Sequence, residues 1–209
     1  MYLDYANGHI GDIGVHWFDQ VLWITGEKAP RRVFSTGGRP IKGAPVLTAQ
    51  EQTGDAPDHQ VAQFAFEQFT MTWESRTFGG NHSERGEAAG AYFYGTKGTV
   101  HLGHKGGWWF YPNEGGEPLH DDAKLNQPDG QNIRELWADF LDAIKTGRRP
   151  VSDIEEAHRS TTCSLLGMIS YKLGRSLAWD GIKEQIVGDP AANKLLRLDY
   201  RKGWEYPAS

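Results

Sequence analysis

Residues 7–26 read NGHIGDIGVHWFDQVLWITG, a polar, glycine-spaced start followed by an apolar run. From Gly11 to about Thr25, apolar residues recur every three or four positions, which predicts a helix with one strongly apolar face. The residues of that face are Ile13, Trp17, Phe18, Val21, Leu22 and Ile24. Gly26 comes directly after this pattern, and a glycine at that place is typical of a helix end.

The polar start of this stretch carries side chains that suit proton transfer. Asp12 and His16 are four residues apart, so on a helix both side chains lie on one face and can address one ligand. A neutral imidazole can accept a proton from a hydroxyl near neutral pH, and a carboxylate can orient that imidazole or hold a neighbouring hydroxyl. An Asp/His pair on a helix is more often structural than catalytic, so the spacing alone leaves both interpretations open.

A metal site at the same place is a weaker hypothesis. His9, Asp12 and His16 are separated by three and four residues, and imidazole and carboxylate groups suit zinc or manganese. Three ligands on one short helix rarely converge without help from another element. We therefore expect no metal here.

The middle of the chain has the pattern of an antiparallel sheet. Apolar and polar residues alternate over 32–35 and 60–73, which predicts strands with one covered face. The stretch 37–57 is rich in Gly, Pro and small polar residues and predicts a long surface loop. Short aromatic runs joined by glycine turns over 91–111 predict further antiparallel strands.

The remainder is predicted to be helical. Apolar residues from Ile133 to Ile144 mark one face of an amphipathic helix that stops at Gly147. The segment 152–155 has the spacing of a capping box and should open a helix that runs to about Leu173. Helices together with antiparallel strands place the chain in the α+β class, and 209 residues suit one domain.

Composition excludes several functional classes. The formal net charge is −5 and no run of Lys or Arg occurs, which argues against nucleic acid or an anionic membrane as partner. No leader pattern and no stretch approaching the ~18 apolar residues of a membrane span is present, so we expect a cytoplasmic protein. Cys163 is the single cysteine, and its apolar helical setting predicts a buried packing residue rather than a nucleophile.

The run 4–23 resembles the family named for glucose-fructose oxidoreductase, inositol dehydrogenase and a rhizopine-catabolism protein (Gfo/Idh/MocA). The signature of that family is a glycine cluster followed by Asp, Gly, His and a second Asp at this spacing. The match continues through 69–74, 93–99, 152–160, 192–196 and 200–205. The resemblance therefore covers nearly the whole chain.

The resemblance implies a fold and a set of site residues. Family members have an N-terminal Rossmann domain for NAD or NADP and a C-terminal α/β domain of the dihydrodipicolinate-reductase-like type. The open, largely antiparallel sheet of that second domain is covered on one face by helices and commonly packs against a partner subunit. By position, Asp12 would hold or orient the substrate, and His16 would act as proton acceptor or hydroxyl ligand. Asn7 and His9 are expected to contact the substrate as well.

Two parts of the family pattern are missing from the sequence. No Gly-x-Gly-x-x-Gly occurs, so the turn that cradles the cofactor phosphates is absent. The family's Glu-Lys-Pro segment has no convincing equivalent, since Glu27-Lys28-Ala29-Pro30 has an extra alanine and follows the signature instead of preceding it.

We therefore expect residues 1–209 to form a single substrate-binding and oligomerisation domain of an NAD(P)-dependent sugar or polyol oxidoreductase. Without the N-terminal Rossmann domain, this chain should bind no cofactor and be redox-inactive. It should form a homodimer or larger oligomer through its sheet, and the outward ring of the adjacent Trp108 and Trp109 is a candidate interface residue. The alternatives are a noncatalytic dimerising carbohydrate-binding module and, less favoured, a non-redox enzyme that uses Asp12 and His16.

Overall fold

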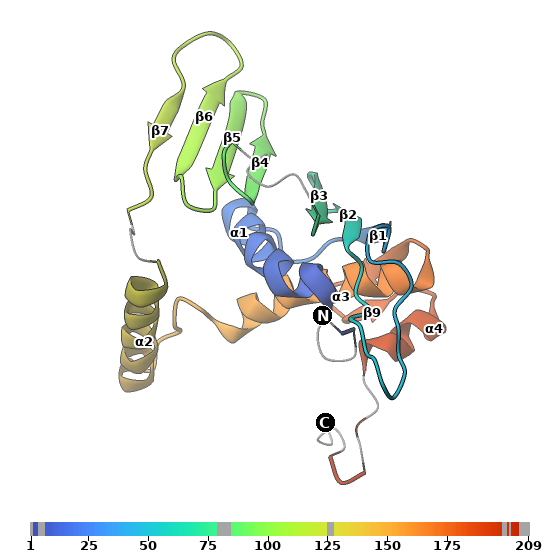
Figure 1. Ribbon diagram of the computed structural model, residues 1–209. Helices are drawn as coiled ribbons and strands as arrows, with labels where there is room; N and C mark the ends of the chain where they lie inside the picture. Colours follow the sequence, from blue (N-terminus) through green and yellow to red (C-terminus); the bar gives the residue numbers. More distant parts are fainter. Residues whose placement is uncertain are drawn as a thin grey trace. The chain divides into compact units, whose positions relative to one another are not determined.

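The computed structural model describes residues 2–3, 7–78, 85–124, 128–197, 200 and 202–204. Contacts divide the chain into two compact units, one made of Met1–Thr77 with Glu155–Ser209 and the other of Phe78–Ile154. Figure 1 labels most of the helices and strands of the two units. Parts of the family-like runs, including residues 4–6, lie outside the described residues.

The first unit begins with the predicted helix. A single π-helical turn, η1 (Ile10–Gly14), continues into α1 (Val15–Thr25), and Gly26 ends α1 with a left-handed φ of 73°. The predicted apolar face is confirmed at its four central positions, which are Trp17, Phe18, Val21 and Leu22. The prediction was wrong for Ile24, which is 53% exposed, because residues 23–26 are all exposed and the last turn lies outside the core.

A five-stranded antiparallel sheet forms the centre of this unit, in the order β3-β2-β1-β8-β9. Its strands are β1 (Arg32–Gly38), β2 (His59–Ala65), β3 (Thr70–Arg76), β8 (Leu177–Asp180) and β9 (Gln185–Ile186). Exposure alternates along β1 and β2, so every second side chain lies on one buried face. The predicted strands and the long loop between β1 and β2 are confirmed.

The core lies between that buried face and the helices η1, α1 and α3 (Ile154–Leu173). Ile10 and Phe64 are both fully buried in it. A Cβ atom on Gly167 of α3 would lie 2.7 Å from Cδ1 of Ile10 and 3.4 Å from Cζ of Phe64. Because Gly167 has no side chain, η1 and β2 can approach α3 closely.

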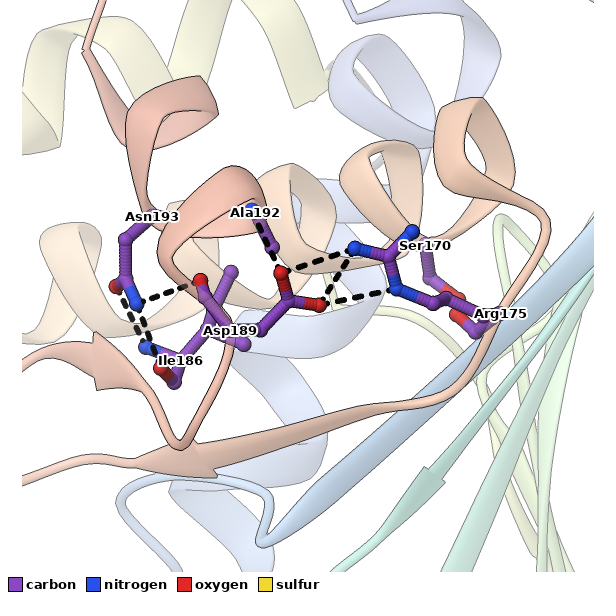
Figure 2. A network of polar contacts seen from close by, with 6 residues as sticks. All are labelled: Ser170, Arg175, Ile186, Asp189, Ala192 and Asn193. Carbon is purple, nitrogen blue, oxygen red and sulfur yellow. Dashed lines mark hydrogen bonds and ion pairs between the residues drawn. The ribbon is translucent and has the colours of Figure 1, made fainter.

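An ion pair fixes the short helix α4 (Pro190–Asn193) to the end of α3 (Figure 2). The Asp189 carboxylate accepts a hydrogen bond from the Ala192 amide at 3.0 Å, which caps α4, and pairs with the Arg175 guanidinium at 2.7 Å. The Ala192 amide and, next, the Arg175 side chain hold the pKa of Asp189 below its usual value. Both contacts favour the charged carboxylate that caps the helix.

The side chains of Asn193 and Ser170 complete this network (Figure 2). The Asn193 amide oxygen accepts from the Ile186 N–H at 2.8 Å, and its NH₂ group donates to the Ile186 carbonyl at 2.6 Å. The Ser170 hydroxyl donates to the Arg175 carbonyl at 2.7 Å and accepts from the Ser35 N–H at 2.9 Å. The family-like segment 192–196 thus contains an asparagine, Asn193, that joins α4 to β9.

The second unit contains a four-stranded antiparallel sheet in chain order. Its strands are β4 (Gly90–Tyr94), β5 (Gly98–Gly103), β6 (Trp108–Pro112) and β7 (Leu119–Asp121). The α+β class is confirmed. The strands form two sheets where one open sheet was expected, because β3 pairs with β2 and β4 pairs with β5, with no ladder between β3 and β4 among the described residues.

The helix α2 (Pro128–Thr146) ends at Gly147, which has a left-handed φ of 71°. The predicted helix and its glycine end are confirmed. The apolar side chains that the spacing would place on a covered face are 44–65% exposed, at Ile133, Leu136, Trp137, Phe140, Leu141 and Ile144. Periodicity predicts which residues share a face and does not establish what covers it.

Opposite faces of the second sheet differ in chemistry. The register places Tyr92, His101, Trp109 and His120 in one row across the four strands. The His120 ring stacks on Trp109 with ring centroids 4.0 Å apart. The neighbouring row, which points to the other face, is Phe93, Val100, Phe110 and Leu119.

The contact between Ile10 and Gly167 yields a first prediction. Gly167→Ala should gain roughly 1 kcal/mol of helix propensity but lose roughly 1–3 kcal/mol to overpacking against Ile10. Ile10→Val alone should cost roughly 0.5–1.5 kcal/mol. Because valine lacks the Cδ1 atom, the double variant should be more stable than the sum of the single effects by at least roughly 0.5 kcal/mol. Urea denaturation of the four proteins measures this coupling, and additive effects would contradict the close contact.

His120 yields a prediction about pH. The Trp108 carbonyl, 2.8 Å from Nδ1, and the Asp122 carboxylate, 2.8 Å from Nε2, raise the pKa of His120 above 6.5. The protonated His120 imidazole therefore contributes fully to the free energy of unfolding below about pH 6.5. This stabilisation is lost as pH rises through the pKa of His120 in the folded protein. The stability difference between wild type and His120→Gln should shrink over that range in urea denaturation.

Asp122→Asn is the control for this experiment. It should lower the pKa of His120 without returning it to the ordinary value, because the Trp108 carbonyl remains. NMR titration of the imidazole measures both values. A stability difference between wild type and His120→Gln that does not change with pH would refute the assignment.

Candidate functional site

The four residues expected to contact the substrate lie on one short segment around η1. Asp12 lies within the π turn and His16 is the second residue of α1, while Asn7 and His9 precede η1. The side chains of Asp12 and His16 are exposed. Within the part of the chain that the structure describes, neither side chain makes a hydrogen bond or ion pair, so both are available to a ligand.

Glycines allow neighbouring side chains to approach the backbone closely in this segment. A Cβ atom on Gly11 would lie 2.8 Å from Cβ of Asn7, and one on Gly14 would lie 3.3 Å from Cγ1 of Ile10. Gly8 has a left-handed φ of 68°, which a residue with a side chain adopts at a cost. Single π turns occur frequently at functional sites. The turn directs the buried Ile10 into the core and leaves Asp12 exposed.

His9 lies beside an aromatic side chain that the sequence interpretation did not select. Its ring centroid is 6.5 Å from that of Trp73 on β3, and Trp73 in turn lies 5.7 Å from Phe18 of α1. His9 Nδ1 and Trp73 Nε1 are both buried, and neither has a hydrogen-bond partner among the described residues. The alternation in β3 predicted that Trp73 faces the interior, but no local pattern indicated that it would lie next to His9.

Gln20 is a second residue that sequence reasoning missed. It follows His16 by one helical turn, and its side-chain oxygen Oε1 is buried without a partner in the described part of the chain. The four-residue spacing of Asp12, His16 and Gln20 was a usable signal. The polar side of this helix therefore extends beyond the two predicted residues.

Glu27-Lys28-Ala29-Pro30, the segment with a superficial likeness to the family's Glu-Lys-Pro motif, lies in a different place. It lines an open groove of about 820 Å³, together with Trp179 and the hydrogen-bonded pair His158 and Glu184. None of the four predicted site residues lines this groove. Lys28 is therefore not brought together with Asp12 and His16.

The described residues do not fit a nicotinamide dinucleotide. Binding the pyrophosphate requires a glycine-rich turn between a strand and a helix of a parallel βαβ unit. The paired strands described for this chain are all antiparallel, and the sequence has no Gly-x-Gly-x-x-Gly. The described residues include groups that can bind a hydroxyl and accept a proton. None of the described residues is assigned to binding the nicotinamide cofactor.

Two other side-chain questions raised by the sequence concern Cys163 and metals. Cys163 is fully buried, and burial raises the pKa of its thiol to about 12, so the prediction of a packing residue is confirmed. Among the residues described, no three His, Cys, Asp or Glu side chains gather in a way that could hold a metal ion. None of the described helices is both long and apolar enough to cross a membrane.

Comparison with known proteins places the chain in a family. Residues 1–206 match the Gfo/Idh/MocA group described as "Oxidoreductase family, C-terminal alpha/beta domain". No curated protein sequence matches the chain. The chain therefore belongs to this oxidoreductase family and corresponds to its C-terminal α/β domain, which confirms the expected family.

Solved structures share the fold at low sequence identity. An oxidoreductase domain protein from Kribbella flavida has a TM-score of 0.61 and 16% identity over 87% of this chain and 50% of that chain. Aldose-aldose oxidoreductase from Caulobacter crescentus, complexed with glycerol, has a TM-score of 0.59 and 19% identity over 82% and 47%. Myo-inositol 2-dehydrogenase from Lactobacillus plantarum has a TM-score of 0.52 and 14% identity over 82% of this chain and 48% of that chain. The chain spans about half the length of these proteins.

Proposed function

We propose that this chain is the substrate-binding domain of an NAD(P)-dependent oxidoreductase that acts on a sugar or polyol, and that it is redox-inactive alone. The observation that carries the proposal is the exposure of Asp12 and His16, without partners among the described residues, at a π turn in a domain of this family. Polar groups that are paired within the chain serve the fold, whereas exposed groups without a partner in it are free to bind a ligand.

The two side chains suit different tasks in alcohol oxidation. The His16 imidazole accepts the proton of the reacting hydroxyl, because neutral imidazole is a base near neutral pH. The Asp12 carboxylate accepts a hydrogen bond from a neighbouring hydroxyl and fixes the orientation of the substrate. The NAD or NADP belongs in this proposal to a Rossmann domain that these residues do not include.

The names of two similar structures support the substrate class. One is an aldose-aldose oxidoreductase complexed with glycerol, and another is a myo-inositol 2-dehydrogenase. Sugars, glycerol and inositol share neighbouring hydroxyl groups on adjacent carbons. A carboxylate and an imidazole one helical turn apart match two such hydroxyls.

We also propose that the chain associates with a second copy through the second sheet. The face of that sheet with Phe93, Trp108, Phe110 and Leu119 is apolar, and Leu119 is 57% exposed. Trp108, also on this face, is the outward ring of the predicted tryptophan pair. Trp109 on the opposite face is covered instead by the Arg85 guanidinium and by His120. Burial of such a face contributes roughly 25 cal/mol per Å² of apolar surface to association, which must exceed the cost of lost translational and rotational freedom.

Ligand binding tests the assignment of Asp12 and His16. The purified chain should bind myo-inositol or an aldose weakly in NMR titration, and Asp12→Asn or His16→Ala should weaken binding by roughly 10- to 100-fold, as for a lost hydrogen bond to a charged group. His158→Ala, which alters the separate groove, is the matched control and should bind like wild type. Equal binding by all four proteins would refute the site.

Cofactor fluorescence provides an independent check in the same preparation. Addition of the chain to NADH or NADPH should leave the fluorescence unchanged at micromolar concentrations. Micromolar binding would contradict the proposal that the cofactor belongs to residues outside this chain.

Light scattering after size-exclusion chromatography tests the proposed association. Wild type should elute as a dimer or larger species, and Leu119→Glu should shift it toward monomer, because a charge in an apolar interface is desolvated without a partner. Tyr94→Glu is the matched control, since Tyr94 is 81% exposed and two residues from Tyr92 on the opposite face. A wild-type monomer at high concentration, or equal disruption by both variants, would reject the apolar face as the interface.

A further inference from the structure

The apolar face of α2 is left uncovered by the described residues. At ~150–250 Å² for a whole large side chain, six side chains that are about half exposed present roughly 600 Å². The largest apolar patch on a typical monomer is about 300–600 Å² and is often functional. An amphipathic helix is stabilised mainly by packing of its apolar face, so α2 needs a surface to pack against. The exposed side chains are Ile133, Leu136, Trp137, Phe140, Leu141 and Ile144.

The polar side of α2 is already engaged within the chain. The Arg148 guanidinium nitrogen Nη2 lies 2.8 Å from a carboxylate oxygen of Asp139 and 2.8 Å from one of Asp142. The Val151 N–H donates a hydrogen bond to the Asp139 carboxylate at 2.7 Å. These contacts attach the segment after the helix to its polar side. The apolar side is therefore the one that is available to a partner.

The apolar residues of α2 have the same order from either end of the helix, which is Ile, Leu, aromatic, aromatic, Leu and Ile. The periodicity of an amphipathic helix makes the positions symmetrical, but it does not dictate the residue types. The face is therefore self-complementary about a centre between Ala138 and Asp139. The matching pairs are Ile133 with Ile144, Leu136 with Leu141, and Trp137 with Phe140.

A two-fold symmetric contact between identical chains requires a self-complementary surface, because each residue must meet the residue that its own counterpart meets. Two α2 helices that run antiparallel satisfy this condition. Ile133 of one copy then lies opposite Ile144 of the other. At the centre, Trp137 of each copy packs on Phe140 of the other. Within one chain these two rings already lie edge-on, with centroids 5.9 Å apart.

We infer that α2 pairs antiparallel with α2 of a second copy of this chain. Two such faces comprise roughly 1,200 Å², which reaches the lower end of the range for specific protein interfaces. The central Trp137 is of the residue type that most often dominates the energy of an interface. This contact goes beyond the proposed function and does not depend on the substrate. Together with the proposed contact through the second sheet, it gives each chain two symmetric contacts and joins four copies.

Cysteine cross-linking of the full chain tests the antiparallel arrangement. Ile133→Cys and Ile144→Cys are prepared separately and mixed, so that copies exchange before mild oxidation. The mixture should form a covalent dimer with one copy of each variant, identified by mass spectrometry. Either variant alone should form none, because its two cysteines lie roughly 16 Å apart along the helix pair. Wild type is the control for Cys163, which is fully buried.

Light scattering measures the contribution of the helix contact to assembly. Leu136→Glu places a charge in the apolar face and should halve the mass, from four copies to two. Ala138→Glu is the matched control, because Ala138 is exposed on the polar side of the same helix. It should keep the wild-type mass. Leu136→Glu combined with Leu119→Glu should be a monomer.

The outcomes separate this inference from the proposed sheet contact. If Leu136→Glu lowers the mass and Leu119→Glu does not, the helix pairing stands and the sheet contact fails. An unchanged mass in Leu136→Glu, without a mixed cross-link, overturns the helix pairing. A covalent dimer of Ile133→Cys alone also overturns it, because the helices are then parallel. If Leu136→Glu lowers only the free energy of unfolding in urea, the face packs within its own chain and the inference is wrong.

Discussion

The position of the signature segment depends on one contact, the packing of Ile10 against the bare backbone of Gly167. Ile10 is fully buried, and a methyl group on Gly167 would lie 2.7 Å from its Cδ1 atom. This contact holds η1 against α3 while Phe18 holds α1 against β2 and β3. The side of the turn opposite Ile10 then faces outward, and Asp12 lies on that side. The carboxylate proposed to bind the substrate is thus oriented by an apolar side chain two residues away.

The same turn separates two kinds of polar group. Asp12 and His16 are exposed and can be solvated while no ligand is bound, so their lack of partners costs little. His9 Nδ1 and Trp73 Nε1 are buried, where an unpaired nitrogen is costly. The exposed pair suits a reacting hydroxyl that must be approached and released.

Sequence patterns predicted the elements whose cause is local. The helix 11–25, its glycine end and the strands over 60–73 follow from periodicity and turn chemistry that act within a few residues. The short strands β7, β8 and β9 were not predicted, because two to four residues carry too little periodicity and the strands form by pairing with β6, β1 and β8, respectively. The division into two sheets and the adjacency of Trp73 to His9 depend on long-range pairing. Asp12 and His16 could be selected from the sequence by the family resemblance, whereas their availability to a ligand is visible only in the structure.

A second pair of a histidine and a carboxylate, His158 and Glu184, shows that residue type alone does not make a binding site. The side chains must also be free to contact a ligand. His158 Nε2 lies 2.7 Å from the Glu184 carboxylate, so the imidazole already has its strongest partner. A ligand at that place would have to break the pair before it gained a contact. At Asp12 and His16 no contact within the described chain has to be broken, so a ligand displaces only water from the carboxylate and the imidazole. Proton acceptance therefore fits the helix start, although both places offer the same two chemical groups.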